Sequence, residues 1–211
     1  MNWMDGVKTI IFDLGGVIVD LDRNRAVCNF EKAGLKNAEE VIGAYLQGGI
    51  FMQFEEGSLD REAFYKEFRS LVGKETPCDE IDNGWMGFVG GIQQYKLDML
   101  DELRKKYAIY LLSNTNPVVM EWAYSPAFSK EGRILPDYFD KLYLSYKIGK
   151  SKPNRAIYEY VIKDAGITPQ ETLFIDDGKA NCLAAAQLGF KTFMPQNGED
   201  FRYIFGLGIE N

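Results

Sequence analysis

Four polar positions in the sequence have the residue types and placement needed for phosphoryl transfer. Each lies at the end of an apolar run or at the start of a helical pattern: Asp13, Ser113 with Asn114, Lys152, and Asp176 with Asp177. Taken singly, each has an ordinary structural explanation, since aspartate and serine often cap helices and most lysines are solvated. The adjacent carboxylates Asp176 and Asp177 fit that explanation least well, because they repel each other unless a cation or a basic group lies between them.

Together, these residue types supply the groups that phosphoryl transfer requires. A carboxylate attacks phosphorus, a divalent cation bridges it to the phosphate, and a lysine neutralises the remaining charge. A small hydroxyl or amide, with backbone N–H groups, holds the other phosphate oxygens. Carboxylate oxygens favour a hard cation, so Mg²⁺ is the metal that the sequence predicts.

Composition excludes several other kinds of chemistry. The 211 residues include no histidine, which rules out Ser-His-Asp and Cys-His catalysis and histidine-ligated zinc within this chain. The net charge is −7, and the longest basic cluster, Arg104-Lys105-Lys106, falls at the end of a predicted helix. There it interacts favourably with the helix dipole, so we expect no nucleic-acid partner.

The sequence also carries no sign of a membrane or a secretory pathway. No apolar run approaches the ~18 residues needed to span a bilayer, and the start MNWMDG lacks the pattern of a signal peptide. The three cysteines, Cys28, Cys78 and Cys182, are widely separated and predict buried free thiols. These features favour a cytoplasmic location, because free thiols are typical of a reducing compartment.

The elements that must position these residues alternate between strand and helix. Apolar runs predict buried strands at 7–14, 108–113, 141–145, 172–176 and 191–194, with helical patterns between the later ones. Between about 23 and 91 the pattern is helical, with no strand, and Ser58 is a candidate N-cap. This order predicts an α/β fold, a doubly wound parallel sheet, whose core comprises 1–19 and 92–211 and carries a helical cap at 20–91.

Ligands of an open parallel sheet bind beyond the carboxyl ends of its strands. The polar positions occupy that location in the predicted fold, and four segments there resemble the motifs of the haloacid dehalogenase-like hydrolase superfamily in the family's order. They are FDLGGVIVD (12–20), LLSNTN (111–116), KSKPNRAIY (150–158) and FIDDGKANCLAAAQLGF (174–190). The sequence is most similar to the small bacterial branch that includes α-D-glucose-1-phosphate phosphatase.

This resemblance implies a Rossmann-like core and a role for each position. Asp13 would be the nucleophile that forms an aspartyl-phosphate, and it would bind Mg²⁺ together with the Gly15 carbonyl and Asp177. Asp176 would hold a metal-bound water or help to position Lys152. Lys152 would stabilise Asp13 and the phosphate, and the remaining pair, Ser113 and Asn114, would bind the transferring phosphate. The block 20–91 would open for substrate and close to exclude water.

The sequence departs from the family pattern at the position two residues after the nucleophile. Most phosphatases of this superfamily have an aspartate there, which acts as general acid and base, and this chain has Gly15. Such help is typically worth 10²–10⁴-fold. Three interpretations follow. The substrate could have a leaving group that needs little protonation, such as the anomeric oxygen of a hexose 1-phosphate, which the resembling branch favours. Asp20 or Asp22 could substitute, although a polar turn explains them more simply.

The third interpretation is a haloacid dehalogenase, because a halide leaves without a proton. That enzyme needs no metal, so it would leave the carboxylates of Asp176 and Asp177 uncompensated. A protein of another class, which binds ligands on the same fold with weak catalysis, also remains open.

Substrate specificity is expected to lie in the cap. Five residues could contact a sugar there or instead form the hydrophobic core: Phe51, Phe54, Glu55, Trp85 and Tyr124. The mixed segment 122–139 could form part of the entrance. The expected partner is a small phosphorylated metabolite, and the sequence leaves monomer and homodimer equally open.

Overall fold

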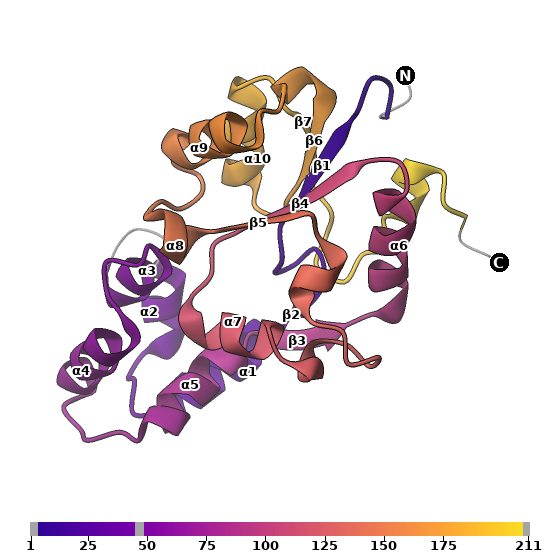
Figure 1. The fold of residues 1–211 in the computed structure, drawn as a ribbon. Coiled ribbons are helices and arrows are strands. Elements are labelled where there is room, and N and C mark those ends of the chain that lie inside the picture. The colour runs from indigo at the N-terminus through magenta and orange to yellow at the C-terminus, as the bar shows by residue number, and fades with distance from the viewer. Residues whose placement is uncertain (1–3, 45–48, 209–211) are drawn as a thin grey trace.

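A five-stranded parallel sheet forms the centre of the protein (Figure 1). The computed structural model describes residues 4–44 and 49–208. The strands, in the spatial order β5-β4-β1-β6-β7, are β5 (Lys141–Leu144), β4 (Ala108–Ser113), β1 (Thr9–Phe12), β6 (Thr172–Ile175) and β7 (Lys191–Phe193). All four pairings are parallel. The predicted doubly wound α/β sheet is therefore confirmed.

Alternation along the strands explains why helices cover both faces of the sheet. Ile11 and Phe174 project to one face and pack against α9 (Arg155–Ala165) and α10 (Lys179–Gln187). Their neighbours Ile10 and Leu173 project to the other face, toward α6 (Gln94–Arg104). Because both faces are buried, the central strands are apolar at nearly every position, which is the run pattern seen in the sequence.

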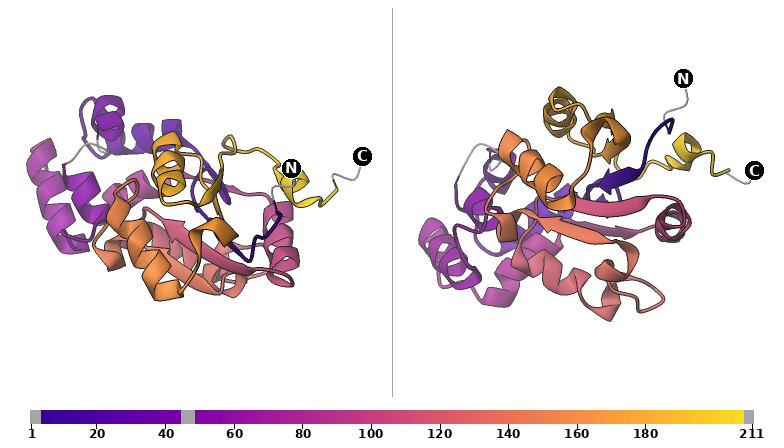
Figure 2. Two further views of the ribbon diagram at one scale, coloured as in Figure 1. Left: turned by 90° about the horizontal axis from the view of Figure 1, so that it is seen from above. Right: turned by 45° about the horizontal axis from the view of Figure 1, so that its top comes forward.

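Five further helices form a separate block at one end of the molecule (violet in Figure 2). They are α1 (Arg23–Lys32), α2 (Ala38–Ala44), α3 (Ile50–Glu55), α4 (Arg61–Val72) and α5 (Cys78–Met86). Aromatic side chains make the core of this helical block, and the rings of Phe54 and Phe64 stack with centroids 4.4 Å apart. Val118, from α7 (Pro117–Ala123), joins the same cluster, so the block rests on α7.

The chain enters and leaves the helical block through two paired strands. β2 (Val19–Leu21) and β3 (Val89–Ile92) are antiparallel, and Val19 lies opposite Ile92. The expectation of no strand between 23 and 91 is therefore wrong, since β3 begins at Val89. The reason is that β3 reads VGGI, and glycine gives no strand signal because it has no side chain to pack.

Two smaller sequence expectations are also corrected. The N-cap of α4 is Asp60, whose Oδ1 accepts a hydrogen bond from Ala63 N at 2.8 Å, whereas Ser58 donates to the Gln53 carbonyl. Asp60 was the stronger candidate chemically, because its carboxylate is charged and stabilises the helix N-terminus. The three cysteines are free as expected, but Cys28 and Cys78 are exposed and only Cys182 is buried.

The segment 122–139 packs mainly against the sheet rather than standing apart as a loop. Its 3₁₀ turns Pro126–Phe128 and Leu135–Tyr138 bury apolar side chains, and Arg133 forms a two-pronged ion pair with Asp101 of α6 at 2.5 and 2.9 Å. The remaining elements are α8 (Ser145–Ile148) and the 3₁₀ turns Pro169–Glu171 and Arg202–Phe205. None of the helices within the described ranges has the length and apolarity needed to cross a membrane.

Candidate active site

The candidate site lies at the carboxyl ends of the three central strands. Asp13 directly follows β1, Ser113 ends β4, and Asp176 directly follows β6. The parallel register places Phe12 beside both Leu111 and Ile175, so the residues that follow them meet at one edge. The topology therefore brings together groups that lie 63 to 163 positions apart in the chain.

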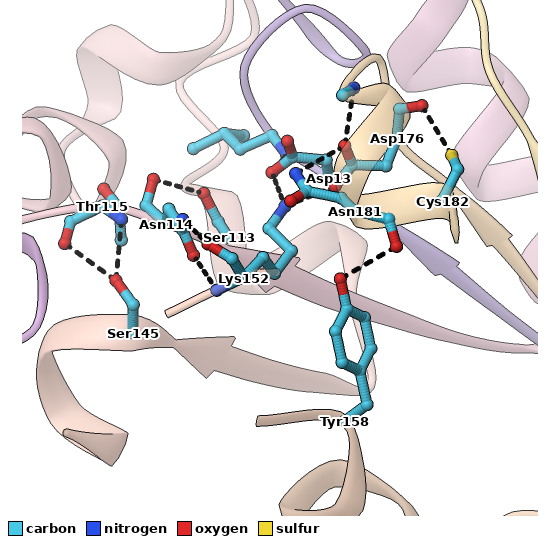
Figure 3. A network of polar contacts seen from close by, with 12 residues as sticks. Asp13, Ser113, Asn114, Thr115, Ser145, Lys152, Tyr158, Asp176, Asn181 and Cys182 are labelled. Atoms are coloured by element: carbon cyan, nitrogen blue, oxygen red, sulfur yellow. Dashed lines mark hydrogen bonds and ion pairs between the residues drawn. The ribbon is translucent and has the colours of Figure 1, made fainter. Parts of the chain in front are cut away.

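Lys152 lies between two of the carboxylates (Figure 3). Its Nζ is 2.9 Å from Asp13 Oδ1 and 2.6 Å from Asp176 Oδ2, and the lysine side chain is only 1% exposed. Burial by itself would lower the pKa of Lys152, but the charges of Asp13 and Asp176 raise it above its usual value. The ammonium therefore stays charged and neutralises part of this acidic cluster.

Asn114 holds the main chain at Lys152. The Asn114 Nδ2 donates to the Lys152 carbonyl at 2.9 Å, and the Lys152 N–H donates to Asn114 Oδ1 at 2.8 Å. This reciprocal pair fixes the start of the lysine side chain relative to β4. The Asn114 amide is thus engaged with the backbone of Lys152, a contact that the sequence analysis did not foresee.

Asp176 is fully buried and is held from several sides. Besides Lys152, its carboxylate accepts hydrogen bonds from the Gly178 N–H at 2.8 Å and from Asn181 Nδ2 at 2.9 Å. The sequence analysis missed Asn181. The available signal was a polar side chain in the first turn of the helix that follows Asp176, where it points back toward the strand end.

Asp13, Asp176 and Asp177 bring carboxylate oxygens within 4.8 Å of one another. Burial raises the pKa of Asp13 to about 7; the Lys152 charge opposes that rise, and Asp176 and Asp177 add to it. Burial and then Asp176 raise the pKa of Asp177 as well. Three carboxylates around one ammonium leave an excess of negative charge, and all the donors are hard oxygens. This donor set fits a divalent cation such as Mg²⁺.

The turn after Asp13 is shaped to let Asp177 approach. Gly16 has φ +74°, and a Cβ there would lie 2.1 Å from Asp177 Oδ2, so only glycine fits without displacing that carboxylate. The hydrogen bonds of this turn use the carbonyls of Leu14 and Val19. The carbonyl of Gly15 takes no part in them, which leaves its oxygen available as a ligand.

A cavity of about 380 Å³ adjoins the carboxylate cluster. Six of the seven predicted site residues line it: Asp13, Gly15, Ser113, Asn114, Lys152 and Asp177. Asp176 does not, because it lies beneath Lys152. The opposite wall comes from the helical block and includes Arg23, Glu55 and Trp85, so the cavity lies between the sheet and that block.

Glu55 is the acidic residue of that opposite wall. It is 8% exposed, and burial, followed by the charge of Asp13, raises the pKa of its carboxyl to about 8. The Ser145 hydroxyl donates to the Glu55 carbonyl at 2.6 Å and accepts from the Thr115 N–H at 2.9 Å. The C-terminal end of α3 is thereby joined to the end of β4.

Three other side chains of the cavity wall have polar atoms in need of partners. Trp85 Nε1, Thr115 Oγ1 and Asn116 Nδ2 are buried and have no hydrogen-bond partner within the described part of the chain. Unpaired buried polar atoms are costly, so each would gain from a hydrogen bond to water or to a ligand that reaches it. These three residues belong to the cavity wall but not to the carboxylate cluster.

Comparison with known proteins agrees with this geometry. A model of the haloacid dehalogenase-like hydrolase family matches residues 7–189. The chain belongs to this family. It is also 50% identical to D-ribitol-5-phosphate phosphatase from Bacteroides thetaiotaomicron, over 93% of this chain and 95% of that protein. The family assignment that the four sequence motifs suggested is therefore confirmed, and the relative is a phosphatase.

Two solved structures of this haloacid dehalogenase-like family are similar over nearly the whole chain. A family hydrolase from Porphyromonas gingivalis is 41% identical, with a TM-score of 0.91 over 97% of this chain and 99% of the other. A family enzyme from Bacteroides thetaiotaomicron, in complex with magnesium and inorganic phosphate, is 42% identical, with a TM-score of 0.86 over 94% and 99%. These relatives share the whole architecture, including the helical block.

Two residues weighed as substitutes for the acid missing at Gly15 are engaged elsewhere in this hydrolase. Asp22 caps α1 by accepting from the Arg25 N–H at 3.0 Å. Asp20 pairs with the buried Lys96 at 2.8 Å, and neither aspartate lines the cavity. Asp22 is therefore the turn residue before the helix that the sequence favoured, whereas Asp20 lies in β2 and is held by an ion pair instead.

Of the five residues that could have contacted a sugar, two line the cavity. Glu55 and Trp85 do so, whereas Phe51 and Phe54 pack inside the helical block. Tyr124 packs against the hydrophobic core of the central sheet. The segment 122–139 contributes Trp122 alone to the described cavity lining. Only the first residue of this segment is therefore placed to form part of a cavity entrance.

Proposed function

We propose that this hydrolase is a Mg²⁺-dependent phosphatase that acts on a small polyol or sugar phosphate. The observation that carries the proposal is the cluster of three carboxylates around the buried Lys152, beside a cavity large enough for a small metabolite. A dehalogenase would not need the metal that this excess of carboxylates fits, since halide departure needs neither metal nor proton. The phosphatase names among its relatives support the same conclusion.

Each carboxylate has a different role in this proposal. Asp13 attacks phosphorus and forms an aspartyl-phosphate, while Lys152 neutralises charge on Asp13 and on the phosphate. Asp13, Asp177 and the Gly15 carbonyl hold Mg²⁺, which supplies charge compensation between the nucleophile and the phosphate. Asp176 holds Lys152 in place through its 2.6 Å contact, which favours the positioning role over that of a water ligand.

Phosphate binding falls to the end of β4 in this proposal. The Ser113 hydroxyl and the amide of Asn114 line the cavity beside Asp13, which supports their contact with phosphate oxygens. Asn114 has a second task, because its side chain already holds the backbone of Lys152. Replacing Asn114 therefore changes the position of the lysine as well as the phosphate contacts.

The far wall of the cavity favours a substrate rich in hydroxyl groups. The unpartnered polar atoms of Trp85, Thr115 and Asn116 would receive hydrogen bonds from, or donate them to, such a substrate. The 50% identity to D-ribitol-5-phosphate phosphatase supports an open-chain polyol phosphate. On this basis we favour a polyol phosphate over the hexose 1-phosphate expected from the sequence.

The test is phosphate release from D-ribitol 5-phosphate and from α-D-glucose 1-phosphate, each with Mg²⁺ and with a chelator. We expect turnover only with Mg²⁺ and a higher kcat/KM for the polyol ester. The Asp13→Asn variant should fold normally but lose turnover, because an amide does not attack phosphorus. Activity retained by Asp13→Asn, or chloride release from 2-chloropropionate instead of phosphate release, would contradict the proposal.

A further inference from the structure

A polyol phosphate presents a chemical difficulty that Gly15 does not solve. Its leaving group is an ordinary alkoxide, which departs readily only if it receives a proton as the P–O bond breaks. General acid help of this kind is typically worth 10²–10⁴-fold, and glycine has no side chain to provide it. Another group facing the cavity must therefore supply the proton, if the proposed function is correct.

Few of the described side chains that line the cavity can do so. The carboxyl groups among them are Asp13, Asp177 and Glu55, and the first two belong to the proposed metal site. Lys152 is held by two carboxylates, and Arg23 keeps its proton at any ordinary pH. Glu55 is the carboxyl that remains.

Glu55 has a position that suits this task. It lies at the end of α3 in the cavity wall that faces the sheet, and Ser145 fixes its main-chain carbonyl at 2.6 Å. Its carboxyl forms no hydrogen bond or ion pair with other residues in the described ranges, so it is available to a ligand. Its charged surroundings are Asp13, Lys152 and Glu56, which places it near the reacting groups.

We propose that Glu55 is the general acid and base of the reaction. As Asp13 attacks phosphorus, the bond between phosphorus and the polyol oxygen breaks, and that oxygen takes the proton of the Glu55 carboxyl. Water then attacks the aspartyl-phosphate and gives one proton to Glu55, the bond from phosphorus to Asp13 breaks, and phosphate leaves. Both steps balance, and Glu55 ends protonated as it began.

Two features of the structure support this assignment. Burial favours the neutral carboxyl, which is the form that donates a proton in the first step. Glu55 also belongs to the helical block, so the acid is in place only while that block is seated on the sheet. The contact from Ser145 to the Glu55 carbonyl is part of that seating, and it links closure of the cavity to the arrival of the proton donor.

The test compares two esters of similar shape that differ in their need for a proton. Nitrophenolate leaves 4-nitrophenyl phosphate unaided, whereas benzyl phosphate releases a basic alkoxide, and neither ester offers hydroxyls to recognise. For Glu55→Gln we expect kcat/KM with benzyl phosphate to fall about 10²–10⁴-fold and with 4-nitrophenyl phosphate less than about tenfold. The aryl ester should also show a burst of nitrophenolate, because hydrolysis of the aspartyl-phosphate lacks its base.

Two further variants separate this role from a structural one. Glu56 is the adjacent glutamate, contacts Ser151 at 2.5 Å and does not line the cavity. Glu56→Gln should therefore change the two esters by the same factor. Glu55→Asp keeps a carboxyl and should recover part of the lost benzyl phosphate activity.

The outcomes distinguish this inference from the proposed function. If the unmodified enzyme shows no Mg²⁺-dependent hydrolysis of either ester, the proposed function fails and the role of Glu55 fails with it. If it hydrolyses both and Glu55→Gln lowers them equally or not at all, the phosphatase stands and the assignment of Glu55 is wrong.

Discussion

Replacing Lys152 by methionine tests the electrostatic account of the site. The substitution keeps most of the side-chain volume and removes the ammonium that lies 2.9 Å from Asp13 and 2.6 Å from Asp176. Three carboxylates within 4.8 Å of one another then have no positive partner. Because Lys152 and Asp176 are almost completely buried, water cannot replace the lost interaction.

The expected cost follows from that burial. Breaking a buried ion pair by removing one partner destabilises a protein by about 3–5 kcal/mol. For a chain of this length, each kcal/mol lowers the melting temperature by about 2–4 °C, so the loss should be about 6–20 °C. Mg²⁺ should restore much of it, since the cation supplies positive charge at the same carboxylates and binds only the folded state.

Thermal unfolding followed by circular dichroism, with chelator and with excess Mg²⁺, measures both effects. The measurement belongs at about pH 8, above the pKa of about 7 to which burial raises the Asp13 carboxyl of the original protein. Lys96→Met is the matched control, because Lys96 is equally buried and pairs with Asp20 at 2.8 Å away from the cavity. It should lose stability that Mg²⁺ does not restore.

Either of two results would refute this reasoning. One is a Lys152→Met protein that unfolds within about 1 kcal/mol of the original in chelator, which would mean that the carboxylates are not uncompensated. The other is an equal rise in melting temperature on adding Mg²⁺ to Lys152→Met and to Lys96→Met. That result would mean that Mg²⁺ does not bind at this carboxylate cluster.

Two further predictions concern a glycine and a surface ion pair. Gly16→Ala should weaken Mg²⁺ binding about 10- to 100-fold by displacing Asp177, as titration of activity with Mg²⁺ would measure. Gly132→Ala, at φ +76° with open space around it, should leave that titration unchanged, and equal effects would contradict the steric argument. The hydrogen bond from Arg133 lowers the pKa of Asp101, so the stability this pair contributes should be present at neutral pH and lost in acid. Urea unfolding of Asp101→Asn should therefore differ from the original protein only above the pKa of Asp101, and by a small amount because the pair is partly exposed.

The sheet and most of the site were predictable because their signals are local. Asp13, Ser113 and Asp176 each end an apolar run, and parallel topology brings such ends together whatever lies between them. Lys152 follows no strand; its residue type and its place before a helical pattern made it a candidate, and the family resemblance supplied its role. Its contact with Asn114 joins residues 38 positions apart, and no local pattern indicates such a pairing.

The helical block was harder to interpret for a related reason. Its aromatic residues are spread over several helices, and nothing in the sequence separates Trp85, which lines the cavity, from Phe51, which packs inside. Glu55 is acidic in a chain with many acidic residues, and its main-chain carbonyl is bound by Ser145, 90 positions away. Which side of a helix faces a distant element is decided by packing, and packing was not visible in the sequence.

The pairing of β2 with β3 has a consequence for how this architecture varies. Val19 and Ile92 lie opposite each other in neighbouring strands, although 72 residues separate them in the chain. The chain therefore enters and leaves the whole helical block through this one pair of strands. The registers of the central sheet are set by residues outside the block. Insertions and exchanges are best tolerated where the two ends of a segment lie close together. Recombination could therefore replace the block as a module, changing the substrate while keeping the carboxylates in place.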